Sequence, residues 1–169
     1  MKTAQKAPAY DGFYNRYGKR VLDICLSVAA LSILWPFYLV IALLIAVEDG
    51  FPVLYRAERG GYQGKTFRIC KFRTMVKNAD RIGGSTTSLR DPRITRVGRF
   101  LRRSSIDELP QIWNVLKGDM SIVGPRPEIP FYVEQFRETI PLYMVKNQVR
   151  PGITGWAQVN GRDELEIPV

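Results

Sequence analysis

Residues 24–47 read ICLSVAALSILWPFYLVIALLIAV, a run of twenty-four positions without a charged side chain. At a rise of ~1.5 Å per residue, a straight helix of this length would cross the ~30 Å hydrocarbon core of a bilayer. The run has no polar face, which a surface helix of a soluble domain would need. It is also longer than the apolar part of a signal peptide, and no small-residue cleavage site follows it. The stretch therefore predicts a membrane segment.

Pro36 stands near the middle of this run, and positive charge flanks both of its ends. A proline inside a helix removes one hydrogen bond and crowds the preceding turn, so we expect a sharp kink. The basic flanks are Lys2, Lys6, Arg16, Lys19 and Arg20 before the run, and Arg56, Arg59 and Lys65 after it. Because basic flanks favour the cytoplasmic side, they predict a re-entrant helix-break-helix with both ends on one face. A tilted spanning helix that tolerates the proline is the open alternative.

The rest of the chain suits one small domain with an anionic partner. The 169 residues carry 25 Lys and Arg against 16 Asp and Glu. Fourteen of the basic residues lie between Arg56 and Arg103, beside only three acidic ones. Such a block favours contact with phospholipid headgroups, nucleotides, lipid phosphates or nucleic acid, and charge alone does not choose among them.

Histidine is absent, and the two cysteines, Cys25 and Cys70, form no metal-binding or disulfide pattern. The absence of histidine excludes Ser-His and Cys-His nucleophile systems and imidazole acid-base chemistry. Nucleophilic attack must then fall to a carboxylate, Lys, Tyr, Ser or Cys.

Local patterns predict an α+β fold that is mainly helical. Two short strands are expected at 53–56 and 66–74 around a Gly60-Gly61 turn. A polar loop follows at 83–91. A basic amphipathic helix is expected from Ile94 to Arg103, a second helix from Leu109 until Gly118 ends it, and a third over 129–140.

The pair Asp107-Glu108 is the first candidate for chemistry. Ser105 and Glu108 have the spacing of a capping box, so these acids could simply start a helix. Pro110 instead fits the first helical position, which would place both acids just before the helix. In either case the helix N-terminus should favour their ionised forms and any phosphate beside them. An ionised Asp needs no general base to act as a nucleophile.

Arginines near this pair could neutralise a phosphate under attack. A carboxylate that attacks a diphosphate brings two anions together, so cations must offset the charge. Arg102 and Arg103 could equally form a solvated or lipid-facing helix surface. Arg126 stands between two prolines in GPRPE, where a stiff backbone would hold its guanidinium in place for a phosphate.

Three longer stretches together resemble a known family. KFRTM (71–75), SSIDELPQIWNVLKGDMSIVGPRPE (104–128) and VRPGITGWAQVNGR (149–162) follow an apolar N-terminal segment in this order. They resemble the monotopic bacterial sugar transferases, the polyprenyl-phosphate phosphoglycosyl transferases. The resemblance implies a re-entrant membrane helix at 21–50 after a basic segment at 1–20. It also implies a cytosolic catalytic domain at 51–169, with amphipathic helices at the membrane interface of the bacterial inner membrane.

The resemblance also implies the chemistry and its residues. A sugar 1-phosphate would pass from a nucleoside-diphosphate sugar, expected to be a UDP-sugar, to undecaprenyl phosphate through a covalent intermediate, starting the synthesis of a surface glycan. Asp107 would be the nucleophile and Glu108 would hold Mg²⁺. The implied phosphate-binding residues are Lys71, Arg102, Arg126 and Arg150, and Pro36 would break the membrane helix. Small members often have Ser before that proline, where this chain has Trp35.

Two other readings compete with this one. A membrane-anchored, basic nucleic-acid-binding module would use the positive block, but it has no recognised motif and leaves the acidic pair unexplained. An inactive scaffold of the same fold is the other. We expect no nucleic-acid partner, expect contact with anionic lipids, and leave homo-oligomers open. Family members usually continue past the NGR motif, and whether this chain is truncated after Val169 is left open.

Overall fold

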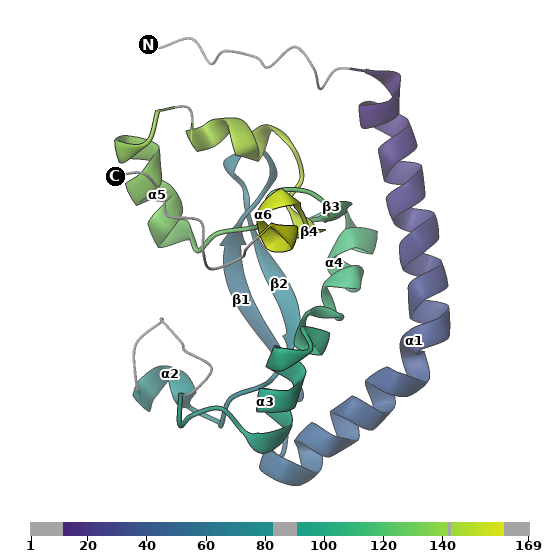
Figure 1. The fold of residues 1–169 in the computed structure, drawn as a ribbon, viewed down its shortest axis with the longest axis vertical. Helices are drawn as coiled ribbons and strands as arrows, with labels where there is room; N and C mark the ends of the chain where they lie inside the picture. Colours follow the sequence, from purple (N-terminus) through teal and green to yellow (C-terminus); the bar gives the residue numbers. More distant parts are fainter. Residues whose placement is uncertain (1–11, 83–90, 142, 161–169) are drawn as a thin grey trace.

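The computed structural model describes residues 12–82, 91–141 and 143–160 of the chain. They form a long N-terminal helix beside a group of short helices and two small sheets (Figure 1). The predicted mixture of helix and strand, with more helix, is confirmed. Most of the predicted basic segment at 1–20 and of the polar loop at 83–91 lies outside the described residues.

Helix α1 (Lys19–Asp49) contains the whole apolar run and follows a short π-helical turn, Tyr14–Gly18. Among the described residues it is the one helix long and apolar enough to cross a membrane. The predicted helix-break-helix is wrong in one respect: the helix continues through Pro36 and bends along its length (Figure 1). Proline removes one hydrogen bond, and the neighbouring turns keep theirs, so a bend replaces a break.

The outer surface of α1 is strongly apolar. Large side chains such as Ile33, Trp35, Phe37 and Val47 are more than half exposed. An exposed apolar surface of this extent is typical of a membrane or protein contact.

The predicted hairpin is confirmed. Strand β1 (Leu54–Gly60) pairs antiparallel with β2 (Thr66–Phe72), and the first strand is longer than expected. Successive side chains of a strand point to opposite faces, so Phe72 enters the core while Lys71 points the other way. Phe72 packs there with Ile45 of α1 and Leu101. The hairpin therefore joins α1 to the rest of the domain.

The short helices largely follow the predicted pattern. Helices α3 (Arg96–Arg103), α4 (Gln111–Lys117) and α5 (Pro130–Thr139) correspond to the three expected segments. Gly118 ends α4 with a φ of 96°, a left-handed conformation that suits glycine. Gly98 lets α3 approach the segment that follows β2, because a Cβ there would collide with the carbonyl of Thr74.

Several smaller elements had no sequence signal. Strands β3 (Ser121–Val123) and β4 (Gly152–Thr154) form a two-stranded parallel sheet. Helices α2 (Ala79–Ile82) and α6 (Trp156–Val159) are single turns, and a 3₁₀ segment spans Tyr143–Gln148. Strands of three residues are too short for a readable alternation, and their pairing joins distant parts of the chain.

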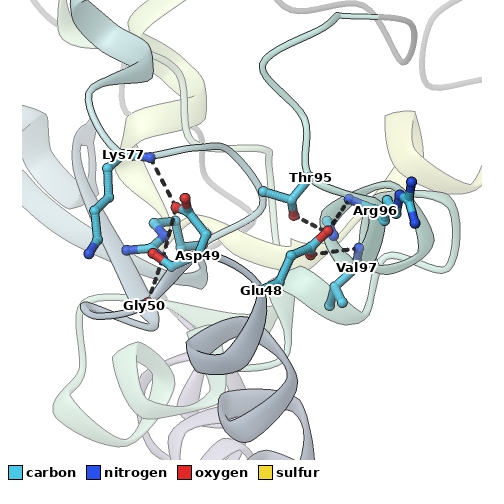
Figure 2. Close-up of polar contacts among 9 residues, drawn as sticks. Glu48, Asp49, Gly50, Lys77, Thr95, Arg96 and Val97 are labelled. Atoms are coloured by element: carbon cyan, nitrogen blue, oxygen red, sulfur yellow. Dashed lines mark hydrogen bonds and ion pairs between the residues drawn. The ribbon is translucent and has the colours of Figure 1, made fainter.

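The C-terminal end of α1 is tied to the start of α3 (Figure 2). The Glu48 carboxylate accepts hydrogen bonds from the backbone N–H groups of Arg96 at 2.7 Å and Val97 at 3.0 Å. These donors have no partner inside α3, and a carboxylate is favoured at a helix N-terminus. The Asp49 carboxylate accepts from the Lys77 N–H at 3.0 Å and pairs with Arg73 at 3.1 Å.

The N-terminal end of α1 is tied to the same domain. The Arg20 guanidinium donates to the carbonyls of Val115 at 2.5 Å and Leu116 at 2.8 Å, near the end of α4. The buried Asp23 carboxylate accepts from the Ile122 N–H of β3 at 3.1 Å. Both ends of the apolar helix therefore contact one domain.

Candidate active site

The acidic pair lies in a tight turn between α3 and α4. Asp107 and Glu108 belong to a 3₁₀ turn, Ile106–Glu108, and Pro110 directly precedes α4. The capping box considered for Ser105 does not form: its hydroxyl caps nothing, and its φ is 57°. The left-handed conformation is disfavoured for a residue with a Cβ by ~1 kcal/mol. It turns the chain so that both acids stand before the helix, as the position of Pro110 predicted.

Both carboxylates are buried, and cations from distant segments reach Glu108. Asp107 and Glu108 are each 9% exposed. The Lys71 Nζ of β2 lies 2.8 Å from Glu108 Oε1, and the Arg126 Nη2 lies 3.5 Å from the same oxygen. A buried carboxylate is stable when such partners offset its lost hydration. The fold thus joins a strand, a turn and the GPRPE segment at one carboxylate.

The pKa of Asp107 shifts in the direction opposite to the one that the sequence predicted. Burial raises the pKa of Asp107, and the charge of Glu108 acts in the same direction. Lys71 and Arg102 oppose this effect and lower the pKa. The helix N-terminus predicted an ionised form and hence a lowered pKa, but the net direction is upward because burial is the largest influence on Asp107.

Arg102 lies on the Asp107 side of the site. Its Nε donates to the Thr74 hydroxyl at 2.8 Å. Burial lowers the pKa of Arg102, and the negative charge of Asp107 acts against this effect. Thr74 therefore orients a guanidinium whose charge acts on the buried aspartate.

The structure brings together three of the four basic residues and separates the fourth. Lys71, Arg102 and Arg126 surround the acidic pair. Arg150 instead donates to the carbonyl of Gly118 at 2.9 Å and lies 5.5 Å from the Tyr62 ring. That carbonyl is at the end of α4 opposite the acids. A phosphate-binding role for Arg150 stays a prediction, and its contacts are structural ones.

A cavity of about 150 Å³ opens beside these residues. Its polar lining includes Lys71 and Arg126, together with Arg59, Gln111 and Glu128. The sequence did not single out Arg59 or Gln111 as site residues. Arg59 carried only the signal of one more cation in a basic block. Gln111 lies inside the DELPQ stretch, and nothing local indicates that its side chain is buried.

Glu108 of the acidic pair fits a magnesium ion that is shared with phosphate. The described residues contain no group of three or more His, Cys, Asp or Glu side chains that could hold a metal. Mg²⁺ usually needs only one or two carboxylates when waters and substrate phosphates supply the other ligands. Glu108, a buried carboxylate beside Asp107, is such a donor.

Comparison with known proteins gives a consistent picture. The sequence model of the family described as bacterial sugar transferase matches residues 14–168. A UDP-N-acetylgalactosamine-undecaprenyl-phosphate N-acetylgalactosaminephosphotransferase of Aeromonas hydrophila is 48% identical over 141 residues, which are 83% of this chain and 33% of the relative. A UDP-glucose:undecaprenyl-phosphate glucose-1-phosphate transferase of Escherichia coli (strain K12) is 47% identical over 165 residues, 95% of this chain and 35% of the relative.

A shorter relative has the same range of identity. A UDP-glucose:undecaprenyl-phosphate glucose-1-phosphate transferase of Caulobacter vibrioides is 46% identical over 143 residues, 85% of this chain and 54% of the relative. The chain thus spans about a third of the length of the first two relatives and about half of the third.

Proposed function

Since the chain belongs to the bacterial sugar transferase family, we propose that it transfers a sugar 1-phosphate from a UDP-sugar to undecaprenyl phosphate. The Aeromonas and Escherichia relatives are named for these two substrate classes, which supports both. Their names differ in the sugar at nearly equal identity to this chain, so the sugar is left open. We further propose that the product begins the synthesis of a surface glycan.

The observation that carries this proposal is the buried Asp107 beside Glu108 with cations around both. A nucleophilic carboxylate must approach a negatively charged diphosphate, and only local positive charge makes that approach favourable. Lys71 and Arg126 contact Glu108, and Lys71 and Arg102 oppose the rise that burial causes in the pKa of Asp107. With no histidine in the chain, an aspartate that needs no general base is the simplest nucleophile.

The proposed reaction has two displacements at one phosphorus atom. A carboxylate oxygen of Asp107 attacks the β-phosphorus of the UDP-sugar, and the bond from that phosphorus to the bridging oxygen breaks, releasing UMP. A phosphate oxygen of the lipid then attacks the same phosphorus. The bond to Asp107 breaks, and the lipid carries a diphosphate-linked sugar while the carboxylate is restored.

We propose that Glu108 holds Mg²⁺ during this reaction. When bound, the ion would offset negative charge on the phosphate oxygens. Lys71 and Arg126 hold the Glu108 carboxylate in place, so its orientation does not depend on the metal. Chelation with EDTA should abolish transfer, and transfer without divalent metal would contradict this role.

We also propose that α1 enters and leaves the membrane on the cytoplasmic face of the inner membrane. The contacts of Arg20 with the end of α4, and of Glu48 with the start of α3, support this topology. Contact of both helix ends with one domain supports a topology in which both ends lie on the same side of the bilayer. The exposed apolar side chains between the ends would lie in lipid, and the bend of α1 would return the chain to the same leaflet (Figure 1).

The other readings are not favoured. A nucleic-acid-binding module would not need a buried acidic pair, and the family match favours a transferase. An inactive scaffold has no use for cations arranged around Asp107 and Glu108.

A screen of nucleotide sugars tests the function directly. The purified chain in detergent is incubated with undecaprenyl phosphate, Mg²⁺ and one of several UDP-sugars, including UDP-glucose and UDP-N-acetylgalactosamine, and UMP release is measured. We expect release with at least one sugar and formation of the lipid-linked product. Absence of product with every UDP-sugar, when the Escherichia relative is active in the same assay, would contradict the proposal.

A further inference from the structure

Gln111, the first residue of α4, has a buried amide with an unused donor. The residue is 2% exposed, and its Nε2 has no hydrogen-bond partner in the described part of the chain. Buried polar groups are nearly always paired, because an unpaired donor loses its hydration without compensation. An exception of this kind calls for a ligand or another explanation.

Asn114, a second residue of α4 with a buried side-chain amide, forms hydrogen bonds within the protein through both its oxygen and its nitrogen. Asn114 is 1% exposed, and its Oδ1 accepts from the Cys70 N–H at 2.9 Å. Its Nδ2 donates to the Arg68 carbonyl at 2.8 Å and to Asp119 at 3.1 Å. Asn114 thus ties α4 to β2 with both ends of its amide. Gln111, one helical turn earlier, leaves its amide nitrogen unused.

The Gln111 side chain lines the cavity beside the acidic pair. The cavity volume of about 150 Å³ exceeds the ~30 Å³ that one liquid water occupies, so a larger polar group can enter. Lys71 and Arg126 line the same cavity and both contact Glu108. A group bound against Gln111 would therefore lie close to the residues proposed for phosphoryl transfer.

The charges around the cavity favour an anion. Three cations, Arg59, Lys71 and Arg126, line it together with one carboxylate, Glu128. Burial lowers the pKa of Arg59, and the like charge of Arg126 acts in the same direction, while Tyr55 and Glu128 oppose it. A bound anion would relieve this repulsion and could accept a hydrogen bond from an amide nitrogen.

We propose that Gln111 Nε2 donates a hydrogen bond to a phosphoryl oxygen of a substrate in this cavity, with Arg59 and Arg126 as the cationic partners of that phosphoryl group. The inference rests on the proposed function, because the phosphoryl group belongs to one of its two substrates. It comes either from the diphosphate of the UDP-sugar or from the phosphate of the polyprenyl acceptor. A neutral donor adds a directed contact here without adding another charge beside two arginines.

The test measures binding and stability of the full chain in detergent. Gln111→Met keeps the approximate shape and removes the unused donor. Gln111→Glu keeps the shape and replaces the donor with an anion. The same change at an exposed glutamine of α5, Gln135→Met, is the matched control. Calorimetric titration gives Kd for UDP-glucose, UDP-N-acetylgalactosamine and undecaprenyl phosphate, with undecaprenol as the lipid lacking phosphate.

We expect Gln111→Met to weaken binding of one phosphorylated probe about 10- to 100-fold, as loss of a hydrogen bond to a charged group implies. Weaker UDP-sugar binding assigns the cavity to the donor, and weaker lipid phosphate binding assigns it to the acceptor. The ligand-free variant should have an unchanged or higher Tm, because a buried unpaired group is removed. Gln111→Glu should bind more weakly still at pH 8 and recover part of its affinity as the pH falls and the new carboxyl becomes a donor.

Other outcomes would overturn the inference. Unchanged Kd values for every probe would mean that no ligand uses Gln111. A Tm several degrees below that of Gln135→Met in ligand-free Gln111→Met would mean that the amide is structural, like that of Asn114. If the wild type transfers sugar phosphate and the variants bind normally, only this inference fails. If the wild type binds no probe, the proposed function fails with it.

Discussion

The hydroxyl of Tyr38, two residues after Pro36 in α1, donates a 2.8 Å hydrogen bond to the carbonyl of Leu109, the residue that follows the acidic pair. The Tyr38 ring also lies 5.5 Å from that of Phe72, the neighbour of Lys71 in β2. The apolar helix thus contacts the segment beside the acidic pair directly, just beyond its proline. One side chain of α1 therefore reaches the backbone directly after Asp107 and Glu108.

Tyr38→Phe should lower kcat with little change in KM. The variant keeps the ring packing and loses one hydrogen bond, worth about 0.5–1.5 kcal/mol, so a decrease in kcat of up to about tenfold is expected. Steady-state kinetics in detergent micelles provide the measurement. Tyr14→Phe removes a hydroxyl from an exposed tyrosine before α1 and should leave both constants unchanged. Wild-type kcat for Tyr38→Phe would mean that this bond does not position the turn.

Asp107→Asn should keep the fold but form no covalent intermediate, because an amide is not an effective nucleophile. Wild-type protein incubated with the UDP-sugar alone should release about one equivalent of UMP. Mass spectrometry should then find a sugar phosphate on the peptide that contains Asp107. Steady-state kinetics with both substrates should be ping-pong.

The alternative to this covalent step is direct transfer to the lipid. A strict requirement for undecaprenyl phosphate in UMP release, or a modification on another residue, would support direct transfer instead.

The same substitution should raise stability at neutral pH. The pKa of Asp107 is raised in the folded state, so folding favours its protonated form. Its ionisation therefore costs stability once the pH exceeds the unfolded value of ~3.9, and the cost is complete above the folded pKa. Asn carries no charge at any pH. The Tm of Asp107→Asn should exceed that of the wild type at pH 8, and the difference should shrink towards pH 4.

Asp49→Asn provides a contrast for this pH series, because Asp49 pairs with Arg73. That substitution removes a favourable ion pair and should not raise the Tm at pH 8. If Asp107→Asn were less stable than wild type at pH 8, the net effect of burial on Asp107 would have the opposite sign.

Arg126→Lys should lower transfer strongly. Lysine keeps the charge but loses the planar group that can contact Glu108 and a phosphate at the same time. We expect a decrease in kcat/KM of about 10- to 100-fold, measured by UMP release. Arg137→Lys on exposed α5 is the matched control. Lys146 is less suitable as a surface control, because it is half-buried over the Tyr143 ring. Equal kcat/KM for the two variants would count against a phosphate contact by Arg126.

Both ends of α1 should be accessible from the cytoplasm. Cysteines are introduced at Gly12 and Lys65, two exposed positions before and after the helix, in a Cys25→Ser background that retains the buried Cys70. A membrane-impermeant maleimide should label both in inverted vesicles and neither in intact spheroplasts. Labelling of the two positions from opposite faces would establish a spanning helix.

The sequence by itself determined the local elements and the identity of the acidic pair. The charge-free run of 24–47, the glycine turn of the hairpin and Gly118 at the end of α4 are local signals, because each depends on neighbouring residues only. The absence of histidine and the order of the three stretches pointed to Asp107 and to the family without any coordinates.

Only the tertiary structure decided which of these residues meet. Lys71 and Arg126 reach Glu108 across 37 and 18 residues, and Tyr38 reaches Leu109 across 71. In the structure, Arg150 lies at the end of α4 opposite the acidic pair, and Arg59 and Gln111 line the cavity. Burial also raises the pKa of Asp107, which the sequence did not predict. Burial and charge depend on which side chains are close in space. The residues that meet here are far apart in the sequence, so no local pattern of residues predicts their contact. These contacts form only when α1, the hairpin and the acidic turn pack against one another.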